Sequence, residues 1–413
     1  MSRPTRTLML PVLVINFADR RTALPRLLSA EIGVGGRMYE IRQARLGDWP
    51  LIKPFINVCY GASAHYKQES RWRWQFVDNP YAKEAGGLVP VWIAVHDGQV
   101  VGQIALQAGR MWIDGSAYPA DWVVDVMVHP DHRGGGLGHK IHDAIRASGR
   151  TLVTLTMADA TRRISERAGC ITLGPVYQFA RIHRLSAKTV SSLIDTRAAH
   201  RPLLRMVGGL LGGSMLGPAV AAIGTKAFRS YNALRKPLSG VAEIWDVERV
   251  APEIADEGFT RAMSKIPALF DRGSEFCQWR FDNAPDLQYQ SVHCDHGRKT
   301  RGFAIWRMPE PSELPFGTLV DIVADPDDVE AISAMSAHAV RAMEPDCEAI
   351  VAGASHPSHI AALKALGFVT VKVHRPTVVT NDPQAAAAVA RYKDRWHFSK
   401  ADHDWDQVHP PGS

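Results

Sequence analysis

The amino-acid sequence predicts an α/β (α+β) protein with two related domains, each a mixed, mostly antiparallel central sheet flanked by helices. Three observations lead to this prediction. The chain has 413 residues, more than one hydrophobic core usually organises. Strand patterns joined by turn signals alternate with helical patterns along the first half. Features of that half then recur in the second half at nearly constant spacing.

The composition indicates a soluble globular chain, with 46% hydrophobic and 22% charged residues. The formal net charge of +6 is a mild excess at this length. It fits an anionic ligand or a membrane surface, and by itself it does not indicate nucleic acid. The five cysteines are scattered and never spaced as CxxC, so neither a disulfide framework nor a zinc site follows. A reducing cytoplasm is the simplest setting.

The first 37 residues are expected to be an N-terminal extension. The apolar run "LMLPVLVINFA" faintly resembles a signal peptide, but Pro11 interrupts it and no A-x-A cleavage site follows. We expect a loose tail or an overlong reading of the gene start. The first domain is expected to begin at Met38 with a short strand, followed by a helix entered at Asp48 with Pro50 in its first turn.

Two hairpin signals follow this helix. The strand patterns "VPVWIAV" and "QVVGQIAL" flank His96-Asp97-Gly98, and "RMWI" and "AYPADWVVDVMV" flank Asp114-Gly115. These signals predict a meander of three or four antiparallel strands.

The meander leads into the stretch "VVDVMVHPDHRGGGLGHKIHDAI" at residues 123–145. Its Val-rich start predicts a strand, and the spacing of Leu137, Ile141 and Ile145 predicts one face of a helix. A glycine-rich loop lies between them, with the sequence Arg133-Gly134-Gly135-Gly136-Leu137-Gly138. Unpaired N–H groups at a helix N-terminus, close backbone approach at glycine and an arginine together bind phosphate or pyrophosphate. The spacing fits neither the dinucleotide fingerprint nor the P-loop.

Three further elements are expected before the first domain closes at residue 185. Residues 151–159 read as a strand, "ATRRISERAG" as a short helix stopped by Gly169, and "VYQFARIHRL" as a last strand.

The second half appears as a copy of the first. The pattern W-x-F-x-x-x-P occurs at Trp74 and Trp279, "HPD" at His129 corresponds to "DPD" at Asp325, and "RAGC" corresponds to "ALGF". The offsets are 205, 196 and 198 residues, which favours a duplicated domain. We therefore divide the chain into residues 1–37, the first domain at 38–185, a helical Gly-rich linker at 186–239, a second domain at 240–381, and a C-terminal helix and tail at 382–413.

Residues 206–225 contain 20 residues without a charge. Their length suits a membrane span, but six glycines and Pro218 disfavour it. A buried or domain-joining helical segment, a peripheral membrane contact and a true span all remain open.

The pattern V-x-V-x-P (Val126, Val128, Pro130) followed by R-x-x-G-x-G (Arg133, Gly136, Gly138) resembles the acetyl-CoA motif of the GNAT superfamily of N-acyltransferases. The meander and the following helix extend the resemblance over residues 38–185. It implies acetyl-CoA as acyl donor, with its pyrophosphate on the backbone N–H groups of the glycine-rich loop. The pantetheine arm would pair with the strand, and a backbone N–H near Val128 would polarise the thioester carbonyl. The predicted donor-binding residues are Val126, Met127, Val128, Arg133, Gly134, Gly135, Gly136, Leu137 and Gly138.

The resemblance also implies direct attack by an amine, which needs a base because an ammonium group has no lone pair. Asp121 and Asp125 are the candidate bases, acting directly or through water. Alternatively, each is a strand-end carboxylate that faces solvent or pairs with arginine. Alternation along the strand predicts that Asp125 faces opposite to Val124 and Val126. Ser165 occupies the position of the tyrosine that is the usual acid in the family, which leaves Tyr177 as the candidate acid.

The second domain departs from the motif. Val329, Ile332 and Ala334 take the places of the arginine and two glycines. We expect this domain to keep the fold without binding CoA, either as a structural partner or as one wall of the acceptor site.

The sequence thus favours a cytoplasmic N-acetyltransferase that acts on an amine of a small molecule or amino sugar. "RWRWQF" at residues 71–76 has the interleaving typical of nucleic-acid surfaces, but its partial copy at Trp279 indicates a role in the fold, so no nucleic acid is expected. The tail "HFSKADHDWD" lacks metal-ligand spacing and is expected to be an exposed acidic turn, so no metal is predicted. The alternatives are a non-catalytic CoA-binding or regulatory module and a membrane-surface-associated scaffold.

Overall fold

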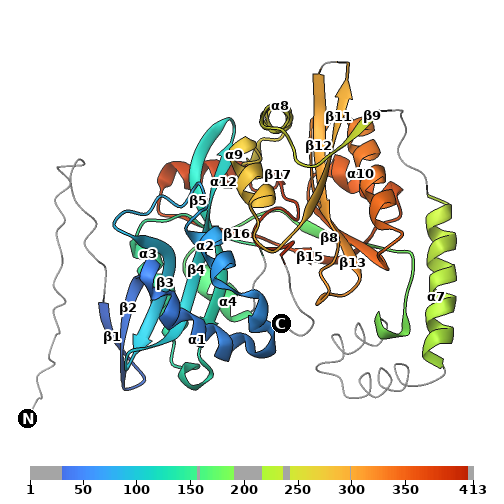
Figure 1. Ribbon diagram of the computed structural model, residues 1–413. Coiled ribbons are helices and arrows are strands. Elements are labelled where there is room, and N and C mark those ends of the chain that lie inside the picture. Colours follow the sequence, from blue (N-terminus) through green and yellow to red (C-terminus); the bar gives the residue numbers. More distant parts are fainter. Residues whose placement is uncertain (1–29, 156–158, 190–215, 236–241, 298, 408–413) are drawn as a thin grey trace, which may run out of the picture.

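The computed structural model describes residues 30–155, 159–189, 216–235, 242–297 and 299–407 (Figure 1). Within these residues two mixed sheets stand side by side, one of ten strands and one of seven, each covered by helices. The predicted α/β architecture with two similar domains is therefore confirmed.

The first half builds most of the larger sheet. Its elements are β1 (Ala30–Val34), β2 (Arg37–Arg45), the 3-10 turn η1 (Leu46–Asp48), α1 (Trp49–Tyr60), η2 (Gly61–Tyr66), α2 (Glu69–Phe76), β3 (Leu88–His96), β4 (Gln99–Ile113), β5 (Ser116–Val128), η3 (Pro130–His132), α3 (Leu137–Ala147), β6 (Leu152–Thr154), α4 (Asp159–Arg167), β7 (Ile171–Thr172) and β8 (Val176–Ile182). The helix α7 (Leu216–Ala233) follows.

The second half has a similar succession of strands and helices, with β10 as an additional strand. Its elements are β9 (Glu243–Val247), α8 (Pro252–Met263), β10 (Ala268–Phe270), α9 (Ser274–Cys277), the π-helical η4 (Gln278–Asp282), β11 (Tyr289–His296), β12 (Lys299–Arg307), β13 (Phe316–Ala324), α10 (Val329–Met343), β14 (Ala349–Ala354), α11 (Pro357–Ala365), β15 (Val369–His374), β16 (Thr377–Val379), α12 (Pro383–Tyr392) and β17 (Trp396–His397).

Both predicted hairpins of the first meander are confirmed. Asp97-Gly98 joins β3 to β4 and Asp114-Gly115 joins β4 to β5, and all four residues have positive φ angles. Two successive left-handed residues match the right-handed twist of the flanking strands, and aspartate followed by glycine tolerates them.

The N-terminal extension contributes a strand, which corrects the expectation of a loose tail over all of residues 1–37. Ala30–Val34 form β1, which pairs with β2 across a turn at Gly35-Gly36. Both glycines have positive φ angles, and a Gly-Gly pair is a sequence signal for such a hairpin. Val34 is buried, which ties the strand to the domain. Residues 1–29 lie outside the described residues.

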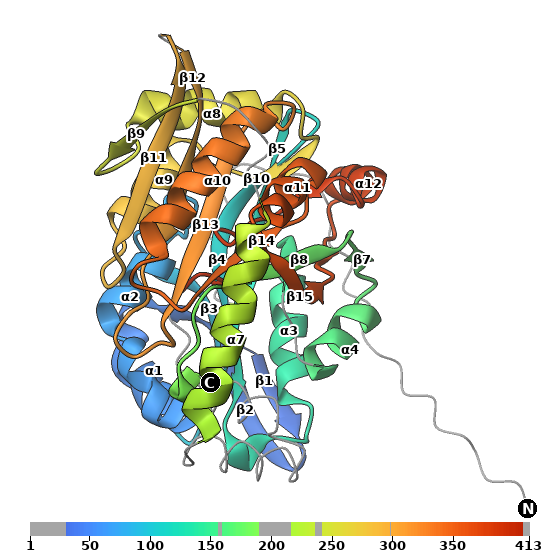
Figure 2. The same ribbon diagram turned by 90° about the vertical axis from the view of Figure 1, so that its right-hand side faces the viewer.

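Strands of each half enter the other sheet, since β8 of the first half lies in the second sheet, and β10, β16 and β17 of the second half lie in the first. We expected β8 to close the first sheet, but it lies in the second sheet between β14 and β15 (Figure 2). In return, β16 from the second half lies in the first sheet between β6 and β7. Periodicity identifies a strand but not its sheet, and a duplicated chain offers two nearly equivalent positions for it. The boundary at residue 185 therefore divides the chain in sequence without separating the two sheets.

The repeated tryptophans lie on opposite sides of an approximate two-fold axis. The indole N–H of Trp74 donates to the carbonyl of Trp279 at 2.7 Å, and the indole N–H of Trp279 donates to the carbonyl of Trp74 at 2.8 Å. Their rings stack with centroids 5.2 Å apart. The buried "RWRWQF" segment thus joins the two domains, in agreement with the predicted role in the fold.

The C-terminal residues return to the first sheet. Ala385 and Val389 of α12 belong to the hydrophobic core of the first domain. Residues 396–407, here called the C-terminal strap, then run between the domains, beginning with β17 beside β10. The strap is buried, which overturns the expectation of an exposed acidic turn. Its Asp402 and Asp406 are each only 1% exposed, because Arg272 and Arg280 of the second domain pair with them.

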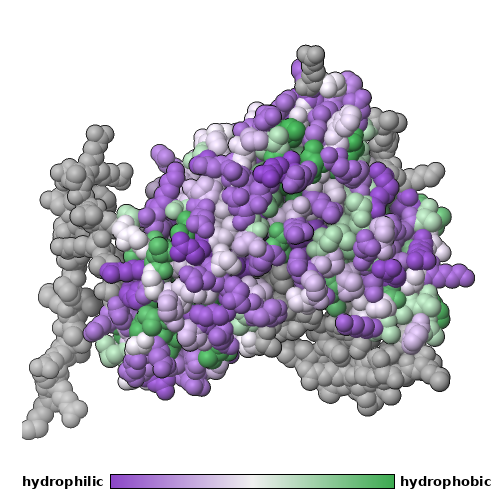
Figure 3. All heavy atoms as spheres, in the orientation of Figure 1, coloured by the Kyte–Doolittle hydropathy of each residue, from purple (hydrophilic) through white to green (hydrophobic). Residues whose placement is uncertain are grey.

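Only part of the uncharged segment at residues 206–225 is described. From residue 216 it forms the start of α7, where Ile223 is exposed. No helix among the described residues has the length and apolar character needed to cross a bilayer. Figure 3 shows hydrophobic residues in small groups on a mostly hydrophilic face. Peripheral contact of residues 206–225 with a membrane stays a prediction.

Candidate active site

The strand, glycine-rich loop and helix occur in the predicted order. β5 ends at Val128, and α3 begins at Leu137. Gly134 and Gly136 have φ angles of 86° and 91°, which other residues adopt at a cost, so the loop needs these glycines. A side chain at Gly135 would place its Cβ 3.2 Å from Val34 of β1. At Gly134, Gly135 and Gly136 the loop therefore presents its backbone without any covering side chain.

Close packing brings the N-terminus of α3 onto the sheet. Leu137, Ile141 and Ile145 are fully buried, as the spacing predicts. At Gly102 of β4 a Cβ would lie 2.8 Å from Ile141, so glycine permits this approach. The residue preceding α3 is Gly136, which has no side chain to cap the first N–H groups. These groups are left for an anionic ligand.

Arg133 is held at the end of β5. Its Nε donates to the carbonyl of Val128 at 2.9 Å, and its side chain is exposed. Among the described residues no carboxylate pairs with its guanidinium, whose remaining N–H groups are thus available beside the loop. This arrangement suits a pyrophosphate.

A β-bulge interrupts β5 directly before the predicted donor strand. Val124 pairs with Ala105 and Met127 with Gln103, so Asp125 and Val126 both oppose Ile104. Asp125 has a φ angle of 48°. On the other side, β5 pairs with β6 only at Asp121 and Trp122. The edge of β5 along Val126, Met127 and Val128 therefore diverges from β6 beside the glycine-rich loop.

Asp125 is the centre of a buried polar cluster. It accepts hydrogen bonds from Tyr60 at 2.6 Å and from Lys67 at 2.8 and 3.0 Å. The Lys67 ammonium lies 5.5 Å from the ring of Tyr60 and 5.6 Å from that of Tyr66. Burial and the charge of Asp125 raise the pKa of Tyr60 well above its usual range, so the phenol remains a donor.

The alternation expected for Asp125 is wrong. Tyr60, which bonds to Asp125, also packs against the core that contains Val124. Neighbouring residues thus both turn toward α1, because the bulge breaks the two-residue period of the strand.

The structure does not bring Asp121 together with Asp125. Asp121 forms an ion pair with Arg150, whose Nη1 lies 2.7 Å from Oδ2, and Arg150 also pairs with Glu84. Burial raises the pKa of Asp121 to about 7 and lowers the pKa of Arg150 to about 10. The alternative expectation, a carboxylate paired with arginine, describes Asp121 better.

Tyr177, the candidate acid, also lies away from this cluster. It belongs to β8 in the second sheet, where it is paired with Ala354 and Val373. Its ring packs beside Phe179 of the second core. The exchange of β8 is the physical reason, because that strand leaves the first sheet. Ser165, in the place of the usual tyrosine, is buried.

The C-terminal strap supplies two residues that the sequence analysis did not select for this site. Nε2 of His403 lies 2.9 Å from the carbonyl oxygen of Val123, and its ring pairs with the Asp404 carboxylate. Burial acts to lower the pKa of His403, but Asp404 outweighs it and the pKa is raised. The contact joins residues 280 positions apart in the chain, and no sequence pattern could have indicated it.

The second domain has a corresponding irregularity in β13, but its cleft is not open. Asp321 occupies the place of Asp125 at the offset that relates His129 to Asp325, and the register of β13 shifts beside it. Arg272 pairs with Asp321 and with Asp402 of the strap. The backbone N–H of Ala401 in the strap donates to the carbonyl of Val320 at 3.1 Å. The protein's own chain thus fills this cleft.

The first turn of α10 also differs from that of α3. The side chain of Asp328 accepts a hydrogen bond from the N–H of Ala331, where the first domain has an uncapped glycine. Arg301 pairs with this carboxylate. A carboxylate at this position repels phosphate, so the second domain lacks the CoA loop, as expected from its sequence.

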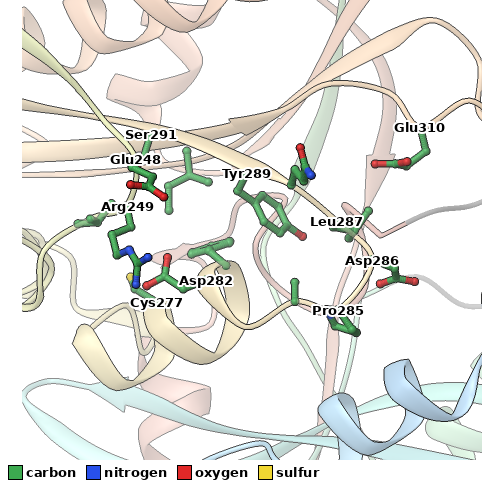
Figure 4. A pocket seen from close by; sticks show the side chains of 15 residues that line it. Glu248, Arg249, Cys277, Asp282, Pro285, Asp286, Leu287, Tyr289, Ser291 and Glu310 are labelled. Atoms are coloured by element: carbon green, nitrogen blue, oxygen red, sulfur yellow. The ribbon is translucent and has the colours of Figure 1, made fainter.

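A hollow of about 730 Å³ lies on the second domain next to the first (Figure 4). Tyr289 is near its centre, with Glu248 and Asp282 toward one end and Glu310 and Asp286 toward the other. Leu287 in its wall packs against Tyr66, the neighbour of the Asp125 cluster. The hollow therefore adjoins the first cleft on the side of Tyr60 and Tyr66.

The comparisons with known proteins agree with this geometry. Residues 40–170 match the family model described as "Acetyltransferase (GNAT) domain". The comparison with curated proteins gives no match. A GCN5-related N-acetyltransferase from Anabaena variabilis is similar in structure, with a TM-score of 0.52 and 11% identity over 82% of this chain and 72% of that one. The N-myristoyltransferase of Saccharomyces cerevisiae, solved with myristoyl-CoA, has a TM-score of 0.53 and 12% identity over 88% and 90%.

The sequence match covers the first domain, and the similarity of fold extends over both. Residues 40–170 match the GNAT acetyltransferase domain model, and the described chain adds a second, similarly folded domain without the glycine-rich loop.

Proposed function

We propose that the protein transfers an acyl group, most simply acetyl, from acyl-CoA to an amine of a small molecule. One observation carries the proposal. An uncapped helix N-terminus and an open, bulged strand edge meet at Arg133–Gly138, and a carboxylate with polar partners lies beside them. These are the features that a thioester carrier and an attacking amine need together.

The donor would bind along the first cleft. Its pyrophosphate accepts hydrogen bonds from the N–H groups of the loop and from Arg133, and its pantetheine arm pairs with the edge Val126–Val128. A backbone N–H near Val128 polarises the thioester carbonyl and stabilises the oxyanion that forms there.

The reaction itself needs two proton transfers. An ammonium acceptor first loses a proton to Asp125, directly or through water, and its lone pair then attacks the thioester carbon. The C–N bond forms and the C–S bond breaks as the tetrahedral intermediate collapses. The second proton of the amine neutralises the departing CoA thiolate. Because a thiolate is a tolerable leaving group, the proposal does not require Tyr177 as an acid.

Packing near the bulge favours a short acyl group. The ring of Trp122 lies 4.3 Å from that of Phe270 and 6.1 Å from that of Phe398. All three side chains are buried. The yeast enzyme of the same fold was solved with myristoyl-CoA, so rates with acyl groups of increasing length measure how far this packing restricts the donor.

The acceptor is proposed to bind between the domains. The hollow beside Tyr66 is lined by the carboxylates of Glu248, Asp282, Asp286 and Glu310 and by Arg249, and Arg71 pairs with Asp286, so the carboxylates outnumber the two guanidinium groups. This balance suits a cationic amine or amino sugar. A cytoplasmic setting, expected from the unpaired cysteines, belongs to the same proposal.

The decisive experiment is titration of acetyl-CoA into the wild type and Gly138→Glu. Gly138 is the best position because its φ is not left-handed and a Cβ there makes an ordinary 3.8 Å contact with Val128. A carboxylate at this position blocks the loop and repels phosphate. Ala147→Glu, exposed at the other end of α3, is the matched control.

We expect loss of binding in Gly138→Glu alone, with melting temperatures similar in both variants. Equal affinity in all three proteins would defeat the proposal. The second candidate function, a non-catalytic CoA-binding module, is favoured by Ser165 in the place of the usual acid. Steady CoA release with a panel of amines separates an enzyme from such a module.

A further inference from the structure

The ladder between β5 and β6 stops at one identifiable carbonyl. The N–H of Asp121 donates to the carbonyl of Thr151 at 2.8 Å, and the parallel register pairs Asp121 with Leu152 and Trp122 with Val153. Since backbone groups of alternate residues point to the same side, the carbonyl of Val123 also faces β6. If the parallel pairing continued, the N–H of Leu155 would donate a hydrogen bond to the carbonyl of Val123.

His403 takes the place of that N–H. Its Nε2 lies 2.9 Å from the carbonyl oxygen of Val123. The imidazole is 6% exposed, and its edge meets the ring of Trp122 with centroids 5.8 Å apart. Asp404 pairs with the other ring nitrogen. The bond that would continue the two-stranded ladder is therefore made by a side chain of the strap.

Backbone strain marks the same place. Four non-glycine residues in the described chain have positive φ angles, and two of them, Asp97 and Asp114, lie in hairpin turns that require it. The other two are Asp125, at 48°, and His403, at 64°. Asp125 follows Val123 by two residues, and His403 contacts the carbonyl of Val123. Strain of this kind persists only where surrounding contacts enforce it.

The second domain supplies those contacts. Asp402, directly before His403, pairs with Arg272, and Asp406, shortly after it, pairs with Arg280. Both arginines are buried in the second domain. The strap is thus anchored on both sides of His403, which it presents to the first sheet.

We infer that His403 is a positioning residue that ends the β5–β6 ladder at Val123 and thereby holds the acyl-CoA cleft open. The second domain, which has lost its own loop, acts on the first cleft through this side chain. The inference takes its ligand from the proposed function. The contact of His403 with the Val123 carbonyl, however, can be tested through backbone hydrogen exchange without any ligand.

The test compares His403→Phe, which keeps a ring and loses the donor, with His403→Gln, which keeps a donor nitrogen at similar reach. His374→Phe is the matched control, because His374 also packs on the strap, with its ring 5.2 Å from that of Trp405. Two readouts are used: hydrogen exchange at the amide of Leu155 by mass spectrometry, and the affinity for acetyl-CoA by calorimetry.

In His403→Phe the ladder is expected to extend, which slows exchange at Leu155 about tenfold, the effect of one added backbone hydrogen bond. Affinity for acetyl-CoA falls by about tenfold or more in the same protein. His403→Gln and His374→Phe remain close to the wild type in both measurements. Asp404→Asn, which weakens the hold on the imidazole, is expected to fall between them and serves if His403→Phe does not fold.

Unchanged or faster exchange at Leu155 in His403→Phe would overturn the inference, as would equal losses in the Phe and Gln variants at position 403. If the wild type binds no acetyl-CoA but His403→Phe still slows exchange at Leu155, the proposed function is wrong. The role of His403 in ending the β5–β6 ladder would then still hold.

Discussion

The two clefts carry an aspartate at the same place on the same bulge, and its surroundings decide what it does. In the first domain Asp125 has a strained backbone, bonds to Lys67 and Tyr60, and lies beside an open strand edge. In the second, Asp321 is sealed beneath the strap by its ion pair with Arg272. One duplicated carboxylate is thus a candidate catalytic group in one half and a structural charge in the other.

The difference lies in how the backbone groups of each cleft are satisfied. An open strand edge leaves backbone groups without protein partners, which costs stability. In the second domain the strap bonds to Val320 and bridges Ala354, so those groups are satisfied internally. In the first domain the proposed acyl-CoA donor would satisfy the open edge. The strap connects these outcomes, since it fills one cleft and holds the other.

The largest effect is expected from separating the halves. Residues 30–185 alone lack β16, which lies between β6 and β7, and leave β8 without its partners. We expect no cooperative thermal unfolding by circular dichroism, because the sheet is interrupted and an unpaired strand is exposed. Co-expression of residues 30–240 with 241–413 should yield a folded one-to-one complex. A monomeric 30–185 fragment that melts cooperatively would show that the exchange is dispensable.

The paired tryptophans test the symmetry between the halves. Trp74→Ala and Trp279→Ala should each lower the free energy of unfolding by about 3–5 kcal/mol, since each removes a buried ring and a hydrogen bond. Urea denaturation measures both. Trp245→Ala, at an exposed tryptophan, is the control and should change stability by no more than about 0.5 kcal/mol. Clearly unequal losses at 74 and 279 would mean that the two sides do not contribute alike.

The two aspartates should respond in opposite ways. Asp125→Asn is expected to lower kcat about a hundredfold or more, the usual contribution of a general base, with little change in acetyl-CoA affinity. Asp321→Asn should leave kcat per folded molecule unchanged but lower the free energy of unfolding by about 3 kcal/mol, because Arg272 loses a buried partner. Steady-state kinetics and urea denaturation decide. Activity that survives Asp125→Asn would move the base elsewhere in the cleft.

The smallest effect concerns pH. The pKa of His403 is raised in the folded state, so its pairing with Asp404 stabilises the protein fully below about pH 6.5, the value of an unperturbed histidine. This stabilisation declines as pH rises through the raised pKa. The difference in unfolding free energy between wild type and His403→Gln should therefore narrow from pH 6 to pH 9. A difference that grows with pH would contradict the assigned pair.

Local patterns predicted much of the first domain. The turns at Asp97 and Asp114, the helix face beginning at Leu137 and the glycines at 134 and 136 all depend on backbone preferences of neighbouring residues, and each is found in the structure. The Gly35-Gly36 hairpin could also have been predicted from local turn preferences. The repeated W-x-F-x-x-x-P pattern likewise indicated that Trp74 and Trp279 have a role in the fold.

Contacts between residues far apart in the chain could not be predicted from such local patterns. The partners of Asp125 come from α1 and the turn after it, and the bulge that turns Asp125 toward them left no mark in the alternation of residues 123–128. Asp121 was a candidate base and Tyr177 the candidate acid, but Asp121 pairs with Arg150 and Tyr177 lies in the second sheet.

The sequence by itself determined where the chain turns, which segments become strands and helices, and that Arg133–Gly138 form a glycine-rich loop at the start of a helix. These depend on the sterics and hydrogen bonding of residues close in the chain. Only the tertiary structure decided that the halves exchange β8 and β16, and that His403 meets Val123 across 280 positions. Two nearly equivalent sheets compete for the same strands, and that competition is settled by the packing of the whole molecule.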